Sequence, residues 1–327
     1  MNLTPRKPLI SIIVISYRMA RELPRTLFSL TPQKQLGVSS EDYEVIVVDN
    51  GTPDFDPQSV CADSSNFQAW QVTDGGVSPC KAINTGLSMA KAPIMAVMID
   101  GARICSPGLV WHSLKAQALD SMAVTGTMGM HIGPDLQMRS VLDGYNQATE
   151  DDLLESVRWS EDPYRLFQIA VPAGSCLDGL FLPFAESNSI CMHATMWDKI
   201  GGFDEGFKTP GGGYANLDAW KRAIETEGAV PVHLLSEATF HQVHGGIATN
   251  SSASPTVPFR EEYKRLRGAE FSVPEYTPLM FGRPDYRSRR ILLEGIEKQA
   301  SSKRNGHLPI AISPETLPPG SMPPGAA

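Results

Sequence analysis

Three apolar stretches of this chain end in side chains that could bind a ligand or take part in catalysis. An unbroken apolar run is typical of a parallel strand buried on both faces, and ligands of open α/β sheets bind outside the carboxyl ends of such strands. We therefore expect the three ends to line one crevice, although each acid alone could equally serve to cap a turn. The polar ends, after the runs 9–15, 43–48 and 94–99, are Ser16 with Tyr17, Asp49 and Asp100.

Composition narrows the class of protein. The chain has 327 residues, 42% of them hydrophobic, which is enough for one large α/β domain or two small ones. Its net charge of −8, without a dense basic block, argues against a nucleic-acid partner. No apolar run approaches the roughly 18–20 residues of a transmembrane segment, and the N-terminus is too polar for a secretory signal. We expect a cytoplasmic protein, with peripheral membrane association left open.

The cysteines and most of the histidines give no sign of a metal framework. Five cysteines are scattered without a Cys-x-x-Cys pair, so neither a zinc site nor a disulfide framework is indicated. We expect most of these cysteines to be small buried side chains. Four histidines lie where the sequence suggests no chemistry, and we expect structural roles for them: His112, His131, His193 and His233.

The elements that must position the polar ends alternate between strand and helix. The apolar patterns predict strands at 9–16, 43–48, 94–99 and 123–128, with helices at 21–30, 79–91 and 106–119. Such alternation predicts a parallel sheet with helices on both faces. Residues 130–185 are irregular, and we expect them to be loops and short elements that cover the crevice.

Regular patterns return in the last third of the chain. They predict strands at 189–193, 230–235 and 238–241, and helices at 195–200, 216–227, 259–267 and 288–299. This division predicts a main domain over 1–250, a helical extension over 251–300 and a disordered tail rich in Pro, Gly and Ser over 301–327.

Four segments in order resemble the family 2 glycosyltransferases. They are 11–17, 45–51, Asn84–Leu87 ahead of Asp100, and 200–205 followed by an acid-bearing helix. The resemblance implies an α/β protein with the GT-A fold of nucleotide-diphospho-sugar transferases, a mostly parallel central sheet with helices on both faces. It also implies an inverting enzyme that moves a sugar from a nucleotide-diphosphate donor to a hydroxyl acceptor. The acceptor, whether glycan, lipid-linked or small molecule, stays unknown.

The resemblance further implies a donor site and a divalent cation, Mn²⁺ or Mg²⁺. Asp100 takes the first acidic position of the family's Asp-x-Asp motif, but Ala102 stands at the last. Either one carboxylate suffices for the cation, or Arg103 binds the diphosphate directly, or Arg103 simply pairs with Asp100. His241 or His244 could complete the cation's ligands. The implied donor-binding residues are Ser16, Tyr17, Arg18, Asp49, Asn50, Asn84, Asp100 and Arg103.

The implied catalytic base is less clear from the sequence. The family usually places a Glu-Asp pair at the start of the helix near 216, and its Asp takes the acceptor proton. Here Asn216 falls at that position, and an amide cannot act as a base. Asp218 is the nearest carboxylate, with a place in the first helical turn as its other explanation, and Glu186 is the reserve candidate.

Two other functions stay open. Ala102 and Asn216 would also fit a sugar-nucleotide binding or scaffold protein that has lost catalysis. A nucleotidyltransferase is less favoured, because the segment 18–21 after the first strand lacks the glycines of a phosphate-binding loop.

Overall fold

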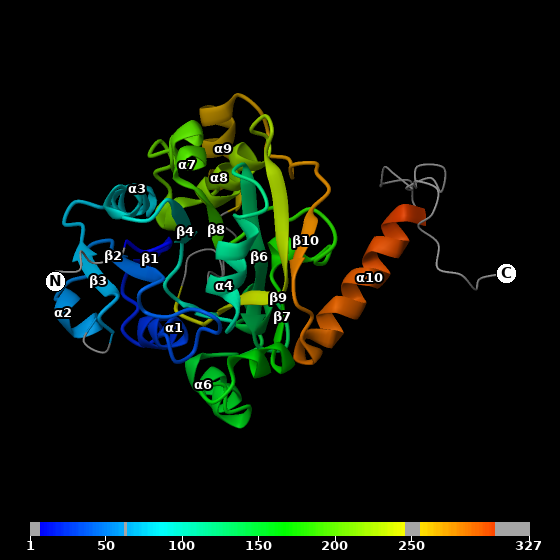
Figure 1. Cartoon of the computed structure of the whole chain (residues 1–327), viewed down its shortest axis with the longest axis horizontal. Coiled ribbons are helices and arrows are strands. Elements are labelled where there is room, and N and C mark those ends of the chain that lie inside the picture. The colour runs from blue at the N-terminus through cyan, green and yellow to red at the C-terminus, as the bar shows by residue number, and fades with distance from the viewer. Residues whose placement is uncertain (1–6, 62–63, 246–255, 305–327) are drawn as a thin grey trace, which may run out of the picture.

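The computed structural model describes residues 7–61, 64–245 and 256–304. Its centre is a ten-stranded sheet in the order β10-β9-β6-β8-β4-β1-β2-β3, to which β5 adds at β9 and β7 at β6 (Figure 1). The strands are β1 (Ile10–Ser16), β2 (Tyr43–Asp49), β3 (Phe67–Gln71), β4 (Ile94–Met98), β5 (Arg103–Cys105), β6 (Ala123–Ile132), β7 (Ala170–Pro172), β8 (Ile190–His193), β9 (Val230–His241) and β10 (Leu279–Gly282).

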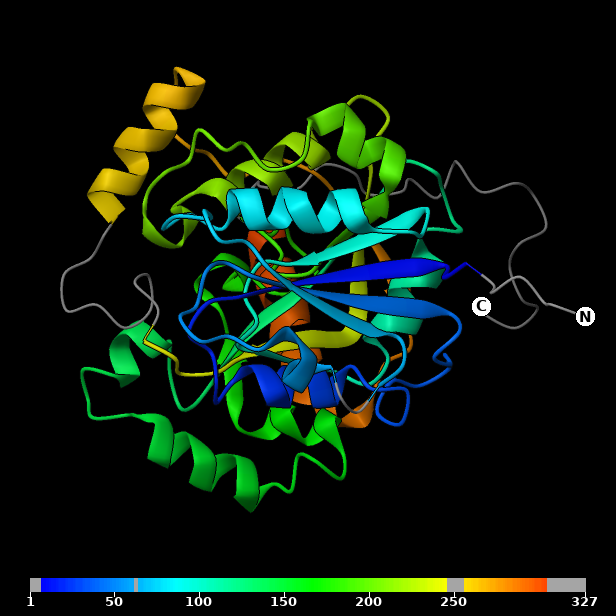
Figure 2. The ribbon, with the colours of Figure 1, turned by 90° about the vertical axis from the view of Figure 1, so that its left-hand side faces the viewer.

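Helices cover both faces of this sheet (Figure 2). The α-helices are α1 (Leu23–Ser29), α2 (Pro57–Val60), α3 (Cys80–Met89), α4 (Leu109–Ala116), α5 (Gln137–Ser140), α6 (Gln147–Ser156), α7 (Ala194–Ile200), α8 (Ala215–Ile224), α9 (Thr256–Arg267) and α10 (Arg289–Arg304). Short 3₁₀ turns are η1 (Pro163–Gln168), η2 (Gly174–Cys176), η3 (Pro210–Gly212) and η4 (Tyr286–Ser288). In the described ranges no helix combines the length and apolarity needed to cross a bilayer.

The central strands form because their side chains are apolar on both faces. Every residue of β1 and β2 is buried. Side chains alternate between the faces of a strand, so Ile13 and Ile46 join the core beneath α3, α7 and α8, whereas Val14 and Val45 join the core beneath α1 and α4. These two cores hold the strand ends rigidly at the crevice.

The sheet register brings the predicted polar ends to one edge. In the parallel pairing of β1 with β2, Ser16 lies opposite Asp49. On its other side β1 pairs in parallel with β4, where Val14 lies opposite Met98, two residues before Asp100. The two acids therefore flank Ser16 at the carboxyl edge, as the apolar runs predict.

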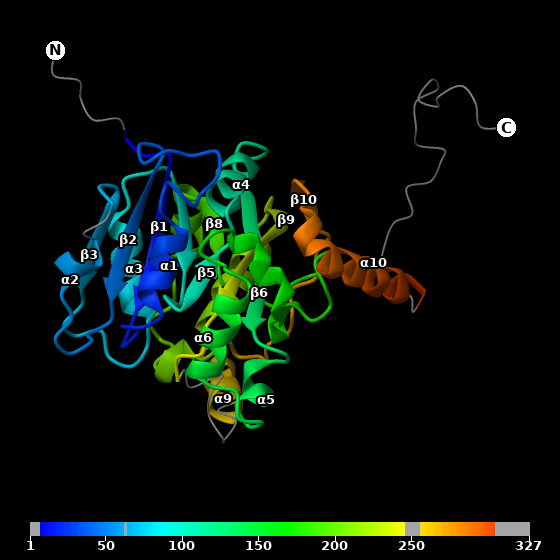
Figure 3. The ribbon, with the colours of Figure 1, turned by 90° about the horizontal axis from the view of Figure 1, so that it is seen from below.

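The C-terminal half of the sheet closes the crevice from the other side. β9 is one strand where the sequence predicts two, with Ser236 at φ 59° between the predicted pieces. β5, which the sequence analysis missed, runs antiparallel to β9 and places Arg103 opposite His241. β10 extends the sheet beyond β9, and α10 lies at the end of the molecule opposite β3 (Figure 3). The predicted tail lies outside the described residues from 305 on, whereas 301–304 belong to α10.

Candidate active site

An aspartate and two histidines meet where β4 and β9 end. The Nε2 atom of His241 lies 2.8 Å from Oδ2 of Asp100, and Nε2 of His244 lies 3.5 Å from the same oxygen. One ligand atom from each of the three residues lies within 4.8 Å of the other two. Carboxylate oxygen with two imidazole nitrogens is a donor set that suits Mn²⁺ or another divalent transition metal. These residues could therefore hold the cation that the sequence predicts.

Two of the three residues in this cluster, Asp100 and His241, have protonation states that suit a cation site. Burial opposes protonation of His244, but the nearby carboxylates, Asp100 above all, outweigh burial and raise the pKa of that histidine. Burial opposes ionisation of Asp100, but the charges of His244 and His241 hold its pKa well below the usual range. Burial and the charge of Arg103 lower the pKa of His241 to about 4, so its ring is neutral at pH 7. A neutral imidazole and an ionised carboxylate are the forms that bind metals.

Two residues of the irregular middle region orient His241. The Nδ1 atom of His241 lies 2.5 Å from Oε1 of Gln137, which accepts the ring proton and leaves Nε2 free to face Asp100. The ring of His131 lies 5.6 Å from that of His241, centroid to centroid. Sequence reasoning missed Gln137. His131, for which the sequence predicts a structural role, accepts the N–H of Gln137 on Nδ1 at 3.0 Å.

Arg103 is a buried cation beside the cluster. It is only 7% exposed, and its Nε lies 3.8 Å from Oδ2 of Asp100, too far for a hydrogen bond. Its Nε and Nη1 atoms have no hydrogen-bond partner among the described residues, and the same holds for the buried hydroxyls of Thr127 and Thr239 on neighbouring strands. Buried polar groups are normally paired. The arrangement therefore suits an anionic, hydrogen-bonding ligand.

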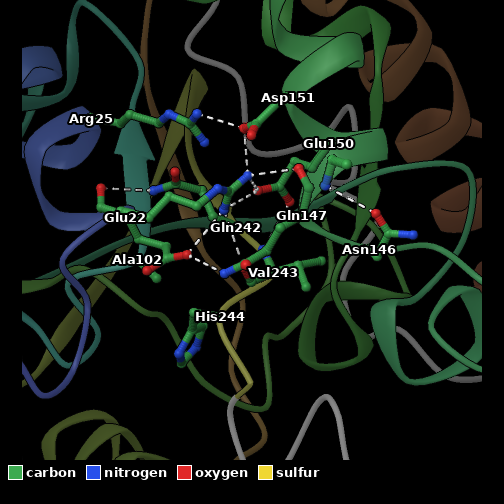
Figure 4. A network of polar contacts seen from close by, with 12 residues as sticks. Glu22, Arg25, Ala102, Asn146, Gln147, Glu150, Asp151, Gln242, Val243 and His244 are labelled. Atoms are coloured by element: carbon green, nitrogen blue, oxygen red, sulfur yellow. Dashed lines mark hydrogen bonds and ion pairs between the residues drawn. The ribbon is translucent and has the colours of Figure 1, made fainter.

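The strap, which we define as residues Gln242–His244 after β9, is fixed by its main chain. Gln242 N–H donates to the carbonyl of Ala102 at 2.9 Å. Val243 N–H donates to Oε2 of Glu150 at 2.8 Å, and Arg21 donates to the carbonyl of Val243 at 3.3 Å. Figure 4 shows these bonds with His244 beside them. The network thus holds His244 close to Asp100.

Helix α6 supplies two acids of this network, and Glu22 before α1 supplies a third, 3.0 Å from Arg21. Glu150 is fully buried, and Arg21 lies 3.2 Å from it and 2.6 Å from Asp151. Burial raises the pKa of Glu150 to about 7. An open cavity of about 570 Å³ lies beside the strap, lined in part by Arg21, Tyr145 and Asp151.

At the end of β2, Asp49 is engaged with its own turn. It is fully buried, and its Oδ1 accepts the N–H groups of Gly51 at 3.0 Å and Thr52 at 2.6 Å. The Thr52 hydroxyl donates to Oδ2 at 2.7 Å, and Gln71 Nε2 reaches Oδ1 at 3.2 Å. Asp49 therefore shapes the loop that follows β2.

Other predicted donor residues divide into exposed and structural groups. Tyr17 is 43% exposed, and the Arg18 guanidinium lies 5.2 Å from its ring centroid, where both could meet a nucleotide. Asn50 donates to the carbonyls of Gly76 and Ser78. The amide of Asn84 is engaged by the main chain, because its Nδ2 donates to the carbonyl of Phe203 and its Oδ1 accepts the N–H of Phe203, both at 2.9 Å.

The two candidate bases differ in their surroundings. Asp218 is 1% exposed, and both its oxygens are bound, to Arg222 at 2.7 Å and to Arg267 at 2.5 Å. Glu186 is half-buried, and its Oε2 accepts a single hydrogen bond, from Asn216 Nδ2 at 2.8 Å. Burial raises the pKa of Glu186, and Asn216 and the charge of Arg103 oppose that rise.

Comparisons with known proteins agree with this architecture. Residues 11–124 match the model of glycosyl transferase family 2. Over 223 residues the chain is 26% identical to the validoxylamine A glucosyltransferase of Streptomyces hygroscopicus subsp. jinggangensis (strain 5008). That alignment covers 64% of this chain and 50% of the relative, so the chain matches about half of the relative's length.

Solved structures show the same fold. S. aureus TarS matches 91% of this chain and 44% of its own chain, with a TM-score of 0.50 at 14% identity. TarS 1–349 in complex with UDP-GlcNAc matches 91% of this chain and 74% of its own, again with a TM-score of 0.50 at 14% identity. The chain has the GT-A-like glycosyltransferase fold, an α/β architecture around a mostly parallel sheet, and this prediction is confirmed.

Proposed function

We propose that this protein is an inverting glycosyltransferase that moves a sugar from a nucleotide-diphosphate donor to a hydroxyl acceptor. The observation that carries the proposal is the meeting of Asp100, His241 and His244 beside the buried guanidinium of Arg103, whose Nε and Nη1 have no hydrogen-bond partner among the described residues. Support comes from the family match over 11–124 and from the crevice at the carboxyl edge of β1, β2 and β4. TarS, whose fold is similar, was solved with UDP-GlcNAc.

The chemistry requires a place for a departing diphosphate. Asp100, His241 and His244 would hold a divalent cation, which when bound neutralises charge on the leaving group. The Arg103 guanidinium is placed to donate two hydrogen bonds to a phosphate oxygen or to bridge two of them. A buried Arg in a low-dielectric site stabilises developing negative charge strongly, because little water competes.

Inversion needs a base on the side of the sugar opposite the leaving group. Asp218 does not suit this role, since two arginines already neutralise and immobilise its carboxylate. Glu186 keeps one oxygen without a hydrogen bond from the described residues and lies in the electrostatic reach of Arg103. We therefore propose Glu186 as the base that takes the acceptor proton.

Release of nucleoside diphosphate tests the proposal. Purified protein is mixed with a panel of nucleotide sugars, with and without Mn²⁺, and the released nucleotide is measured with water or added hydroxyl compounds as acceptor. We expect Mn²⁺-dependent release, at least tenfold slower in His244→Ala. The control is His193→Ala, whose ring lies outside the cluster against Thr195 and should leave the rate unchanged.

Two outcomes would favour the other functions. Tight donor binding with no nucleotide release under any condition would support the scaffold protein that Ala102 and Asn216 suggest. Production of pyrophosphate would support a nucleotidyltransferase. Soluble protein with neither binding nor release would refute the donor site itself.

A further inference from the structure

Asn216 is unusual among the polar residues of the crevice because its amide is directed wholly at one short segment. It is 5% exposed, at the start of α8. Its Nδ2 donates to Oε2 of Glu186 at 2.8 Å and to the main-chain carbonyl of Ser187 at 3.0 Å. One amide therefore fixes both the side chain of Glu186 and the main chain that follows it.

The main chain before Glu186 is held just as closely. The N–H of Phe184 donates to the Tyr276 hydroxyl at 2.8 Å, and its carbonyl accepts from Trp220 Nε1 at 3.2 Å. Its ring stacks on His233 with centroids 3.7 Å apart. Three elements distant in sequence thus fix this residue, two positions before the carboxylate.

Immobilising one oxygen of Glu186 leaves the other available. Oε2 accepts the Asn216 bond, whereas Oε1 accepts no hydrogen bond from the residues that the structure describes. The charged or titratable groups that act on Glu186 are Arg103 from β5 and Cys176 from η2. A carboxylate held at one oxygen and free at the other suits general-base catalysis.

We propose that Asn216 is the positioning residue of the catalytic base, holding Oε2 of Glu186 so that Oε1 faces the acceptor hydroxyl. The inference rests on the proposed function. In the transfer step the acceptor oxygen forms a bond to the anomeric carbon as the bond from that carbon to the diphosphate oxygen breaks. The acceptor proton passes to Oε1 of Glu186, and the bonding electrons leave with the nucleoside diphosphate.

The pH dependence of turnover tests whether Asn216 positions Glu186. The assay uses the nucleotide sugar and acceptor that give the fastest nucleoside diphosphate release by the wild type. We expect Glu186→Gln to lower kcat at least a hundredfold, with the donor KM within about twofold, because the base acts in the transition state. In Asn216→Ala we expect kcat to fall about tenfold, and the acid limb of its pH profile to move up by about one unit, because the amide favours the ionised carboxylate.

A control in the same helix separates positioning from stability. Asp218→Asn removes ion pairs of α8 but should leave the acid limb in place, and melting temperatures report folding for every variant. Since the position of the limb does not depend on the amount of folded protein, a poorly folding Asn216→Ala remains informative. Adding an external carboxylate, formate, should restore part of the turnover of Glu186→Ala.

The outcomes separate this inference from the function on which it rests. An unchanged acid limb in Asn216→Ala, or wild-type kcat in Glu186→Gln, would overturn the pair while the transferase stands. No nucleotide release by the wild type with any donor would overturn both.

Discussion

The two sides of the crevice satisfy their polar groups in different ways. On the side of β1 and β2, Asp49 and Asn84 bind turns and main chain, and among the described residues of this rim Asn50 Oδ1 is the buried atom left without a partner. On the side of β5, β6 and β9, two nitrogens of Arg103 and two threonine hydroxyls are buried without a hydrogen-bond partner in the described part of the chain. The polar groups of the first side stabilise the fold, whereas those of the second side suit a ligand from outside the chain.

This contrast shows that the same residue type at the same position in a strand can have different roles. A carboxylate at the end of a parallel strand is equally suited to a turn and to a ligand, and only the kind of its partners distinguishes the two roles. The four donors around Asp49 come from its own turn and from β3. Asp100 accepts one bond in its own turn, from the N–H of Ala102, and its other oxygen faces Arg103 and two histidines.

The largest effect should come from Arg103. In Arg103→Met we expect nucleotide release to fall about a hundred- to a thousandfold, because a buried cation that stabilises the leaving group is lost. Its melting temperature should stay level or fall slightly, since the cost of burying the guanidinium roughly offsets the gain from its 3.8 Å ion pair with Asp100. Arg103→Lys, which keeps the charge without the planar fork, should retain an intermediate rate. If Arg103→Met does not fold, Arg103 stabilises the fold, and the contrast between the two sides of the crevice is wrong.

Asp49 should behave in the opposite way. Asp49→Ala leaves several buried donors without an acceptor, and we expect the free energy of unfolding to fall by about 3 kcal/mol in urea denaturation. Asp49→Asn keeps an amide oxygen for the turn and should lose about 1 kcal/mol. A full loss of nucleotide binding with unchanged stability would show that Asp49 serves the ligand instead.

The smallest effect should come from Glu150, through the pH dependence of stability. Glu150 sharpens the comparison because it lies on the β9 side of the crevice but stabilises the fold. Its pKa is raised from 4.5 to about 7 in the folded protein, so the folded state binds a proton more readily than the unfolded state. Its ionisation therefore lowers the free energy of unfolding as pH rises from about 5 to 8, on the order of 2 kcal/mol.

Urea denaturation at pH 5 and pH 8 measures this dependence. Glu150→Gln should flatten it relative to the wild type. Asp151→Asn is the matched control, because the arginines of the network lower the pKa of Asp151 and its contribution is lost at low pH instead. Equal slopes in wild type and Glu150→Gln would contradict a buried, reluctantly ionised Glu150.

The sequence predicts the core of the fold well because burial on both faces leaves a local signature. The runs at β1, β2 and β4 are unbroken, and their ends are correctly placed at one edge. The three-residue strand β5 has no such signature, because it exists through its pairing with β9. Helix α6 lies in the region that the sequence predicts as irregular, because most of its side chains are polar and its buried acid serves the strap.

The sequence identifies candidate site residues, but it does not reveal which residues distant along the chain contact them. The family resemblance singles out Asp100, Arg103 and the two histidines, and the structure brings them together. Arg222 is four residues from Asp218, as helical periodicity encodes. Arg267, however, is 49 residues from Asp218, and Phe203 is 119 residues from Asn84, which no periodicity encodes. The same limit hid the contact between Asn216 and Glu186.

One hydrogen bond has a consequence for the proposed cation site. Because Gln242 N–H donates to the carbonyl of Ala102, and Arg103 lies opposite His241 in the pairing of β5 with β9, the loop bearing Asp100 and the strap bearing His244 form a single clasp. The three side chains are therefore already assembled in the folded protein. Under the proposed function we expect the clasp to bind a divalent cation without rearrangement. Because Glu150 of α6 binds the strap, a deleted α6 should weaken metal affinity from a distance.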